Sequence, residues 1–144
     1  MSCIRFNTAS MRKQQAEAAL HAPIMQHPAP EVTPSKIARL RLMATDKNPK
    51  IRERVALDRH TPEGVREALS KDPNTGVRAC VARNETTSCD LLRVLATDDS
   101  EVVRGFVALN YFVPDDVMPV LAVDSSATVR GLVSWKTQLT ERTE

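Results

Sequence analysis

Aromatic residues and glycines are scarce in this chain, and both shortages exclude classes of structure and function. Phenylalanine, tryptophan and tyrosine together make up 3% of the 144 residues, so the core has to be built from Val, Leu, Ile, Ala and Met. The four glycines are isolated, and none belongs to a glycine-rich loop that cradles phosphate. No stretch approaches the roughly 18 apolar residues needed to span a bilayer, so no membrane partner is expected.

Cysteine and histidine are equally sparse, and their spacing argues against a catalytic or metal site. Cys3, Cys80 and Cys89 form an odd, scattered set, which is neither a disulfide framework nor a zinc knuckle. The three histidines are far apart and match no known catalytic arrangement. We therefore expect no cofactor, no metal and no enzyme activity. Residues 1–22 carry charges and no apolar signal-peptide core, so a cytoplasmic location is expected.

The chain does have an internal repeat with a step of 26 residues. An aspartate, an arginine and a valine each recur four times with this step. The aspartates are Asp46, Asp72, Asp98 and Asp124, the arginines are Arg52, Arg78, Arg104 and Arg130, and the valines are Val55, Val81, Val107 and Val133. Such self-similarity is typical of stacked repeat proteins, in which each unit buries its apolar face against its neighbours.

Each unit is expected to hold two short helices. Thr61 followed by Pro62 predicts a helix start, with the threonine as the N-cap and the proline at the first helical position. Asn84 and Asn110 suit a helix end in the left-handed conformation. The aspartate of each unit falls in the turn between its two helices. The fold predicted is all-α, an α-solenoid of four helical-hairpin repeats.

Three segments are expected along the chain. Residues 1–34 are predicted to be an N-terminal arm, with a short helix over residues 9–21 and a proline-rich linker after it. Residues 35–136 are predicted to hold the four repeats. Residues 137–144 are predicted to be a polar tail that frays.

The segment from Leu95 to Asn110 reads Leu-Ala-x-Asp-x-x-x-x-Val-Arg-x-x-Val-Ala-x-Asn. This motif resembles the HEAT-like repeats of bacterial proteins, in particular the leucine-rich repeat variant group, and the resemblance covers residues 35–136. It implies that the solenoid is right-handed, a right-handed α-solenoid built as a superhelix of alternating short helices. A member of that group carries a cysteine-rich iron–sulfur segment before its repeats. Cys3 is the only cysteine before the repeats here, so no cluster is expected.

The recurring aspartates and arginines have two interpretations. The arginines could form a cationic stripe for phosphate, since a guanidinium matches phosphate in a bidentate fork. Alternatively, each arginine pairs with an aspartate of its own or an adjacent unit, while the aspartate caps the second helix. Equal numbers and fixed spacing favour the second interpretation, because half-buried charges are normally paired.

A second recurring position suggests a binding surface. It is occupied by Leu57, Arg83, Leu109 and Trp135. Gly105 and Gly131 lie one turn before Leu109 and Trp135, and their small size would leave a shallow apolar groove along the second helices. The glycines could equally serve only for close helix packing. The leading hypothesis is a non-enzymatic scaffold or adaptor module that binds a peptide or protein at these four residues.

The first unit is basic, and this supports an alternative function. Lys50, Arg54 and Arg59 are the residues expected to contact phosphates if the module binds nucleic acid. This alternative is less favoured, because no recognised nucleic-acid-binding motif accompanies the charge.

Charge also differs between the two halves of the chain. Residues 1–83 hold 15 Lys and Arg against 8 Asp and Glu, whereas residues 84–144 hold 5 against 10. Opposite charges at the two ends favour head-to-tail contact between copies, and the N-terminal arm offers another route to a homodimer.

Overall fold

The computed structural model describes residues 31–141, with the side chains of residues 31–139. The expected helix over residues 9–21 and most of the expected linker lie outside the described residues. Within them the chain is all-helical, which confirms the all-α prediction there. The eight helices of the described residues are α2 (Pro34–Met43), α3 (Pro49–Leu57), α4 (Glu63–Leu69), α5 (Thr75–Arg83), α6 (Cys89–Leu95), α7 (Glu101–Leu109), α8 (Val117–Ala122) and α9 (Ala127–Glu141).

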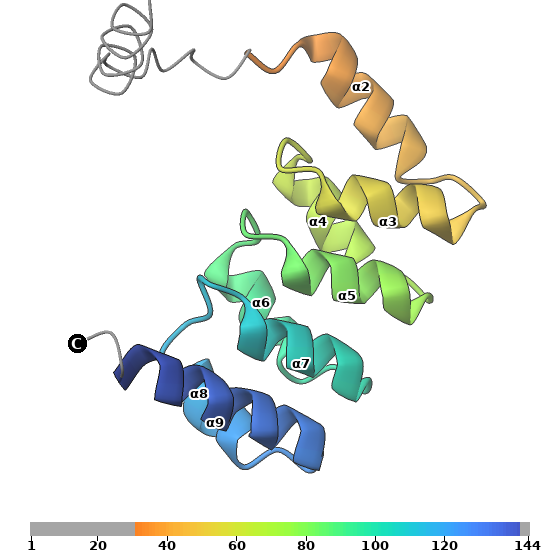
Figure 1. Ribbon diagram of the computed structural model, residues 1–144. Coiled ribbons are helices and arrows are strands. Elements are labelled where there is room, and N and C mark those ends of the chain that lie inside the picture. The colour runs from red at the N-terminus through yellow and green to blue at the C-terminus, as the bar shows by residue number, and fades with distance from the viewer. Residues whose placement is uncertain (1–30, 142–144) are drawn as a thin grey trace, which may run out of the picture. The chain divides into compact units, whose positions relative to one another are not determined.

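The helices form two rows (Figure 1). The second-helix row comprises α3, α5, α7 and α9, in which each helix packs on the next. The first-helix row comprises α2, α4, α6 and α8, and each of these helices packs on the second-row helix that follows it in the chain. Contacts between successive second-row helices are the most extensive in the structure, so this row positions any surface built on it.

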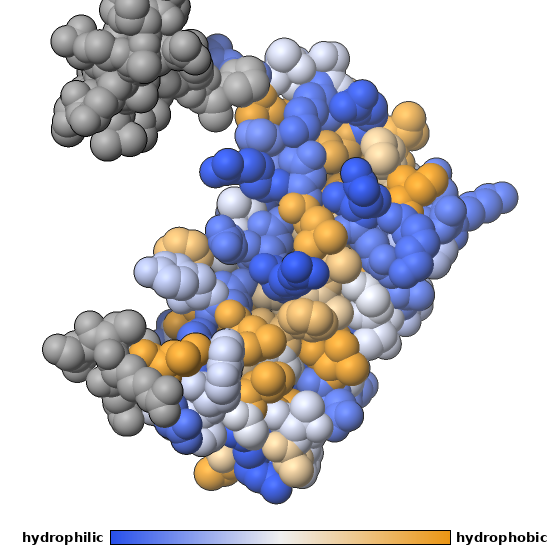
Figure 2. Space-filling model, in the orientation of Figure 1, coloured by the Kyte–Doolittle hydropathy of each residue, from blue (hydrophilic) through white to orange (hydrophobic). Residues whose placement is uncertain are grey.

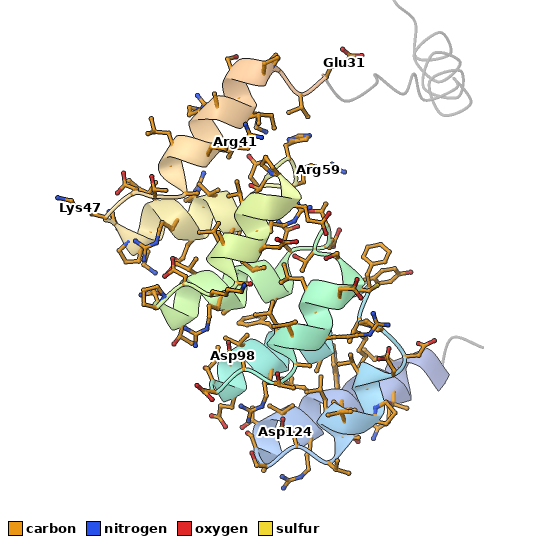
Figure 3. The ribbon with its side chains drawn as sticks, turned by 180° about the vertical axis from the view of Figure 1, so that it is seen from behind. Glu31, Arg41, Lys47, Arg59, Asp98 and Asp124 are labelled. Carbon is orange, nitrogen blue, oxygen red and sulfur yellow. The ribbon has the colours of Figure 1, made fainter. Side chains whose placement is uncertain are left out.

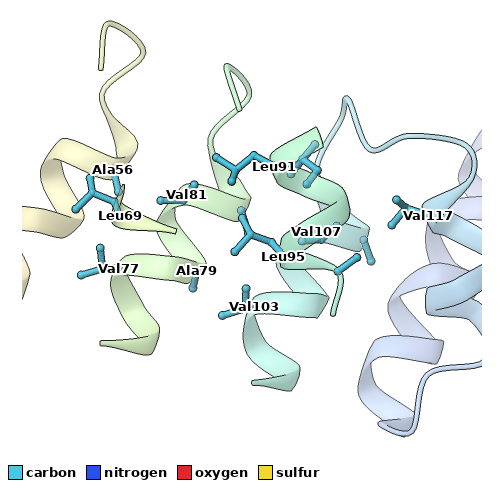
Figure 4. Close-up of a cluster of buried hydrophobic side chains, with 14 of the residues drawn as sticks. Ala56, Leu69, Val77, Ala79, Val81, Leu91, Leu95, Val103, Val107 and Val117 are labelled. Carbon is cyan, nitrogen blue, oxygen red and sulfur yellow. The ribbon is translucent and has the colours of Figure 1, made fainter. Parts of the chain in front are cut away.

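The core lies between the two rows and consists of small and medium aliphatic side chains. Figure 4 shows Leu69 and Val77 beside Ala56 of the preceding helix pair. Val77 and Ala56 are fully buried and Leu69 nearly so. The corresponding residues of the next pairs are equally buried, namely Leu95, Val103 and Ala82, then Leu121, Val129 and Ala108. Burial of a valine or leucine side chain contributes about 1.5–3 kcal/mol, so these repeated contacts are the main source of stability.

The turn before each second-row helix uses the recurring aspartate. Asp72 Oδ1 accepts a hydrogen bond from the backbone N–H of Asn74 at 2.8 Å, and Asn74 Oδ1 in turn accepts from Val77 N–H at 3.3 Å. Asn74 is therefore the N-cap of α5, while the aspartate forms an Asx turn two residues earlier. The expectation that the aspartate itself caps the helix is wrong, because the N-cap is the residue two positions later.

Two other helix ends differ from expectation. Pro62, not Thr61, is the N-cap of α4, because the Thr61 hydroxyl is used to donate a hydrogen bond to the Val55 carbonyl at 2.6 Å. Asn84 and Asn110 follow α5 and α7 with extended backbones, and no non-glycine residue of the described part has a positive φ. Their side chains form the contacts described below, which the left-handed conformation would redirect.

The last helix is longer than expected. α9 continues through Glu141, whereas residues from position 137 onward were expected to fray. Thr137 Oγ1 donates to the Val133 carbonyl, a bond back to the preceding turn that a helical threonine commonly makes. Within the described residues, none of the helices has both the length and the apolar character needed to cross a membrane.

Candidate functional site

Three arginines of the second-helix row pair with the aspartate of the following helix pair. Arg78 donates from Nε and Nη2 to the two carboxylate oxygens of Asp98, at 2.8 and 3.1 Å. Its Nη1 also donates to the backbone carbonyl of Asp72 at 2.8 Å. Arg52 with Asp72 and Arg104 with Asp124 repeat this geometry. Each guanidinium therefore ties its own turn to the next one, and Figure 3 shows Asp98 and Asp124 following one another along this edge.

These pairs shift the acidity of the aspartates. Hydrogen bonds from Arg52 hold the pKa of Asp72 below its ordinary value, and the effect outweighs that of burial. Burial acts to raise the pKa of Asp98, but hydrogen bonds from Arg78 and from Ser100 N–H outweigh it, so the net shift is downward. The pKa of Asp124 is lowered mainly by Arg104. All three aspartates are therefore charged partners in bidentate ion pairs. Their arginine partners have no unpaired Nε and Nη2 donors left to bind a phosphate.

The two outermost members of the series are placed differently. Arg130 donates from Nη1 to the carbonyls of Asp124 and Ser125, but its Nε and Nη2 have no acceptor among the described residues. Asp46 accepts from Asn48 N–H and forms no ion pair within the described part of the chain. The series thus ends with an unused donor pair on α9 and an unpaired carboxylate before α3.

A second recurring series was missed from the sequence. Asn84 Nδ2 donates to the Ala56 carbonyl at 2.8 Å, and Asn110 Nδ2 donates to the Ala82 carbonyl at 2.8 Å. Lys136 occupies the next position of this series, and its Nζ donates to the Ala108 carbonyl at 2.9 Å. These side chains saturate carbonyls at the end of the preceding second-row helix. The signal was the 26-residue spacing itself, obscured because the three residues are not of one type.

Lysine replaces asparagine at position 136 because α9 does not end there. Asn84 and Asn110 stand just beyond their helices in extended backbone, from which a short amide reaches back. Lys136 lies inside α9, so only a longer side chain can reach the same carbonyls. Burial lowers the pKa of Lys136, as expected for an ammonium group taken partly out of water.

The four predicted binding residues are all exposed, but they do not line one groove. Leu57, Arg83 and Leu109 are the last residues of α3, α5 and α7, whereas Trp135 lies within α9. Leu57 and Arg83 line a hollow formed with Arg59 and with the loop that follows α5. Leu109 lines a separate groove between α7 and α9. Trp135, with 55% of its surface exposed, lies on α9 one turn beyond Gly131. The structure therefore divides the predicted face into a basic hollow and an apolar groove.

The groove between α7 and α9, called here the α7–α9 groove, has a volume of about 190 Å³. Its lining is almost wholly aliphatic or aromatic, and Figure 2 shows hydrophobic side chains gathered over this part of the molecule. The lining residues are Glu101, Val102, Gly105, Phe106, Leu109, Thr128 and Leu132. Val102 is 52% exposed and Leu109 38% exposed. Solvated apolar side chains grouped in a concave surface are typical of a protein-binding site.

Gly105 controls the depth of this groove. A Cβ atom at Gly105 would lie 3.1 Å from Cδ1 of Leu132, whereas one at Gly131 would meet nothing within 4 Å. The close-packing interpretation therefore applies to Gly105, where α7 and α9 approach each other. It does not apply to Gly131, whose Cα faces open space in the described structure.

The basic hollow, lined by Leu57, Arg59 and Arg83, differs in its chemistry. Arg59 and Arg83 are both exposed, and the Asn84 and Thr86 side chains on its other side are occupied by hydrogen bonds to each other and to backbone. Glu85 is the only acidic residue of the lining. The hollow can therefore accept a carboxylate or another anionic group on its two guanidinium groups.

The residues predicted for nucleic-acid binding are dispersed. Lys50 pairs with Glu53 at 2.9 Å on α3. Arg54 lines a groove between α2 and α3 together with Arg39, and Arg59 belongs to the basic hollow. The structure thus brings Arg54 together with Arg39, which the sequence did not single out. The charge of Lys50 is neutralised by Glu53.

The two cysteines of the described part have different surroundings. Cys80 is partly buried against the core, and burial raises the pKa of its thiol, which disfavours the nucleophilic thiolate. Cys89 is exposed and donates weakly to the Phe112 carbonyl. No group of His, Cys, Asp or Glu in the described residues is arranged to hold a metal ion.

Comparison with protein-family models, with curated proteins and with solved structures returns no match to this chain.

Proposed function

We propose that this chain is a protein-interaction module without enzymatic activity, built as a right-handed α-solenoid of four helical-hairpin repeats of the HEAT-like kind. Its binding surface is the exposed side of the second-helix row. The ligand is a peptide segment of a partner protein, with one or two apolar side chains and a nearby acidic residue.

The observation that carries this proposal is the α7–α9 groove. Val102 and Leu109 are large apolar residues that remain exposed beside a glycine floor, and the helices that carry them are fixed by the core. An apolar side chain inserted between them would lose contact with water at about 25 cal/mol per Å² of buried surface. A preformed groove also spares the ligand the cost of ordering its receptor.

The acidic part of the ligand is inferred from charge. Arg59 and Arg83 face the same hollow two helix pairs before the α7–α9 groove, on the same row. A carboxylate there would form charge-assisted hydrogen bonds with guanidinium donors. An extended peptide that follows the row would contact both places, which gives it a direction as well as an anchor.

The test is a selection of linear peptides from a random displayed library against the whole protein. The expected result is enrichment of a motif that combines Leu, Phe or Trp with Asp or Glu. Binding of a synthetic consensus peptide should weaken at least about tenfold on Val102→Glu, since one lost apolar contact of about 1.4 kcal/mol corresponds to that factor.

Val94→Glu is the matched control, because Val94 is a similarly exposed valine, 58% against 52%, on α6 of the other row. It should leave peptide affinity unchanged. Arg83→Glu should weaken peptides that contain the acidic residue and spare those that lack it. Recovery of no motif, or equal loss in Val102→Glu and Val94→Glu, would contradict the proposal.

Nucleic-acid binding is the second candidate, and the groove shared by Arg39 and Arg54 favours it. Binding of single-stranded and duplex oligonucleotides would then fall steeply with salt, and the double variant Arg54→Glu/Arg59→Glu would abolish it. Binding of peptides that lack the acidic residue should change little with salt, so these peptides distinguish the two functions in one titration series.

A further inference from the structure

The first and last helix pairs carry the two halves of a contact that the structure makes three times internally. Arg52, Arg78 and Arg104 each grip the aspartate that lies 20 positions later. Arg130 has no such aspartate in the described chain, and its Nε and Nη2 point to no described acceptor. In the 26-residue register, the aspartate equivalent to the partners of the other arginines that lacks an arginine among the described residues is Asp46.

The last helix pair also exposes residues that the earlier pairs bury. Ser134 is exposed, whereas its counterparts Ala56, Ala82 and Ala108 are fully buried. Ala122 is exposed where Ala96 is buried, and Gly131 is exposed where Gly105 is buried. These exposed residues are small, like those that accept the next helix pair inside the stack. A closed end would be expected to carry large polar residues instead.

The first helix pair has the complementary face. Met43 and Ile51 are half-buried, whereas the residues in their register, Leu69 and Val77, are buried against the preceding pair. Inside the stack, Leu69 and Val77 face Ala56 (Figure 4). Met43 and Ile51 of one molecule therefore match in kind the side chains that Ser134 of another would receive.

Net charge adds to the match. Residues 33–58 hold seven Lys and Arg against three Asp and Glu, and residues 111–141 hold two against four. The two helix pairs therefore carry net charges of opposite sign. These charges attract each other over distances up to a Debye length, which is about 10 Å at 0.1 M salt.

We propose that a second copy of this chain docks head to tail, with Arg130 of one molecule in a bidentate ion pair with Asp46 of the next. The expected geometry is that of the internal pairs, with Nε and Nη2 at 2.7–3.1 Å from the two carboxylate oxygens. Asp46 already holds the same turn geometry as Asp72, since it accepts Asn48 N–H at 2.8 Å. No rearrangement of the turn is needed for it to receive the guanidinium.

The proposed contact between two copies lacks one hydrogen bond that successive helix pairs form within the chain. Asp58 stands in the register of Asn84 and Asn110, and a carboxylate cannot donate to the carbonyls that those amides satisfy. The contact between copies is therefore weaker than the internal stacking, reversible and dependent on concentration. Because the two faces differ, association continues beyond a dimer unless the chain of copies closes into a ring.

The test is sedimentation equilibrium of the full chain over a concentration series at low salt. The expected result is an average mass that rises with concentration and falls towards the monomer as salt is added. Arg130→Glu and Asp46→Arg should each remain monomeric, because each change places like charges at the junction. Their equimolar mixture should associate again, and so should the double variant Arg130→Glu/Asp46→Arg, in which the pair is reversed.

Circular dichroism and melting temperature establish that the variants fold. Asp46→Asn retains the acceptor for Asn48 N–H and replaces Asp46→Arg if the latter fails to fold; it should lower the association constant at least tenfold. A wild-type chain that stays monomeric at low salt overturns the proposal. So does association of Arg130→Glu equal to that of the wild type, which would place the contact elsewhere, or failure of the mixture to recover association.

Discussion

Removal of one internal arginine tests how much the repeated Arg–Asp pairs stabilise the stack. Arg78→Ala would leave the Asp98 carboxylate with its Ser100 N–H donor but without its ionic partner. The two side chains are 17% and 10% exposed. Breaking a buried pair costs about 3–5 kcal/mol, whereas an exposed pair contributes about 0.2–1 kcal/mol. For this mostly buried pair we expect a loss of about 2–3 kcal/mol.

The chain supplies a matched control for this experiment. Arg130 occupies the same position of its helix pair and makes the same Nη1 contacts to its turn, but it has no carboxylate partner among the described residues. Arg130→Ala should therefore change stability by no more than about 0.5 kcal/mol, as most surface substitutions do. The difference between the two variants isolates the carboxylate contact from the loss of the arginine side chain.

The assay is urea unfolding followed by circular dichroism, on dilute protein so that contacts between copies do not contribute. With a slope of about 2 kcal/mol per molar urea, Arg78→Ala should lower the midpoint by about 1 M or slightly more. Asp98→Asn should restore part of this loss in the Arg78→Ala background, because an unpaired amide costs less to bury than an unpaired carboxylate. Equal midpoints for Arg78→Ala and Arg130→Ala would refute the reasoning.

Three further outcomes are expected. Asn110→Ala should destabilise by about 1–3 kcal/mol in the same urea assay, since it leaves the buried Ala82 carbonyl without a donor; a change below about 0.5 kcal/mol would show that water replaces the amide. Gly131→Ala should stabilise by up to about 1 kcal/mol through helix propensity, whereas Gly105→Ala should gain less or lose stability, because its Cβ presses on Leu132; identical effects would contradict the difference in space at the two sites. Finally, the lowered pKa values of Asp72, Asp98 and Asp124 mean that their pairing stabilises the fold fully above the unfolded-state pKa of about 3.9 and is lost as pH falls through the folded-state values. Stability should be flat from about pH 7 to 5 and fall below about pH 4, with a shallower fall in Asp98→Asn.

The sequence was sufficient to predict helices in pairs, because the 26-residue step repeats both the apolar positions and the turn residues. It also indicated that arginine and aspartate pair, since equal numbers at fixed spacing leave few other partners. Which aspartate each arginine reaches depends on how far one helix pair is displaced from the next. That displacement is a property of packing, and no residue type in the repeat encodes it alone.

The asparagine series shows where sequence reasoning failed. Asn84 and Asn110 follow helices, and an asparagine in that place commonly adopts the left-handed conformation. Here the amide instead reaches 28 positions back to Ala56 and Ala82, a tertiary contact that outweighs the local preference. The single groove expected along the second-helix row is not formed, for a related reason. Equal spacing suggested one continuous face, but the neighbouring side chains differ. Leu57 and Arg83 therefore line one hollow, and Leu109 lines another.

The division between shared and differing positions separates the proposed binding surface from the residues that stabilise the fold. The residues that repeat in type, such as Val55, Val81 and Val107, are buried at the junctions, where any change would disturb stacking. The residues that change from one pair to the next, such as Arg54, Arg83, Val102 and Leu109, are exposed and line the hollows of the second-helix row. Side chains there can vary at little cost to the core, which is how one scaffold presents a basic hollow near one end and an apolar groove near the other. Exchanging the exposed Val102 and Leu109 for polar residues should therefore alter the choice of peptide in the proposed binding more than it alters stability, whereas the conservative change Val81→Ala should do the opposite.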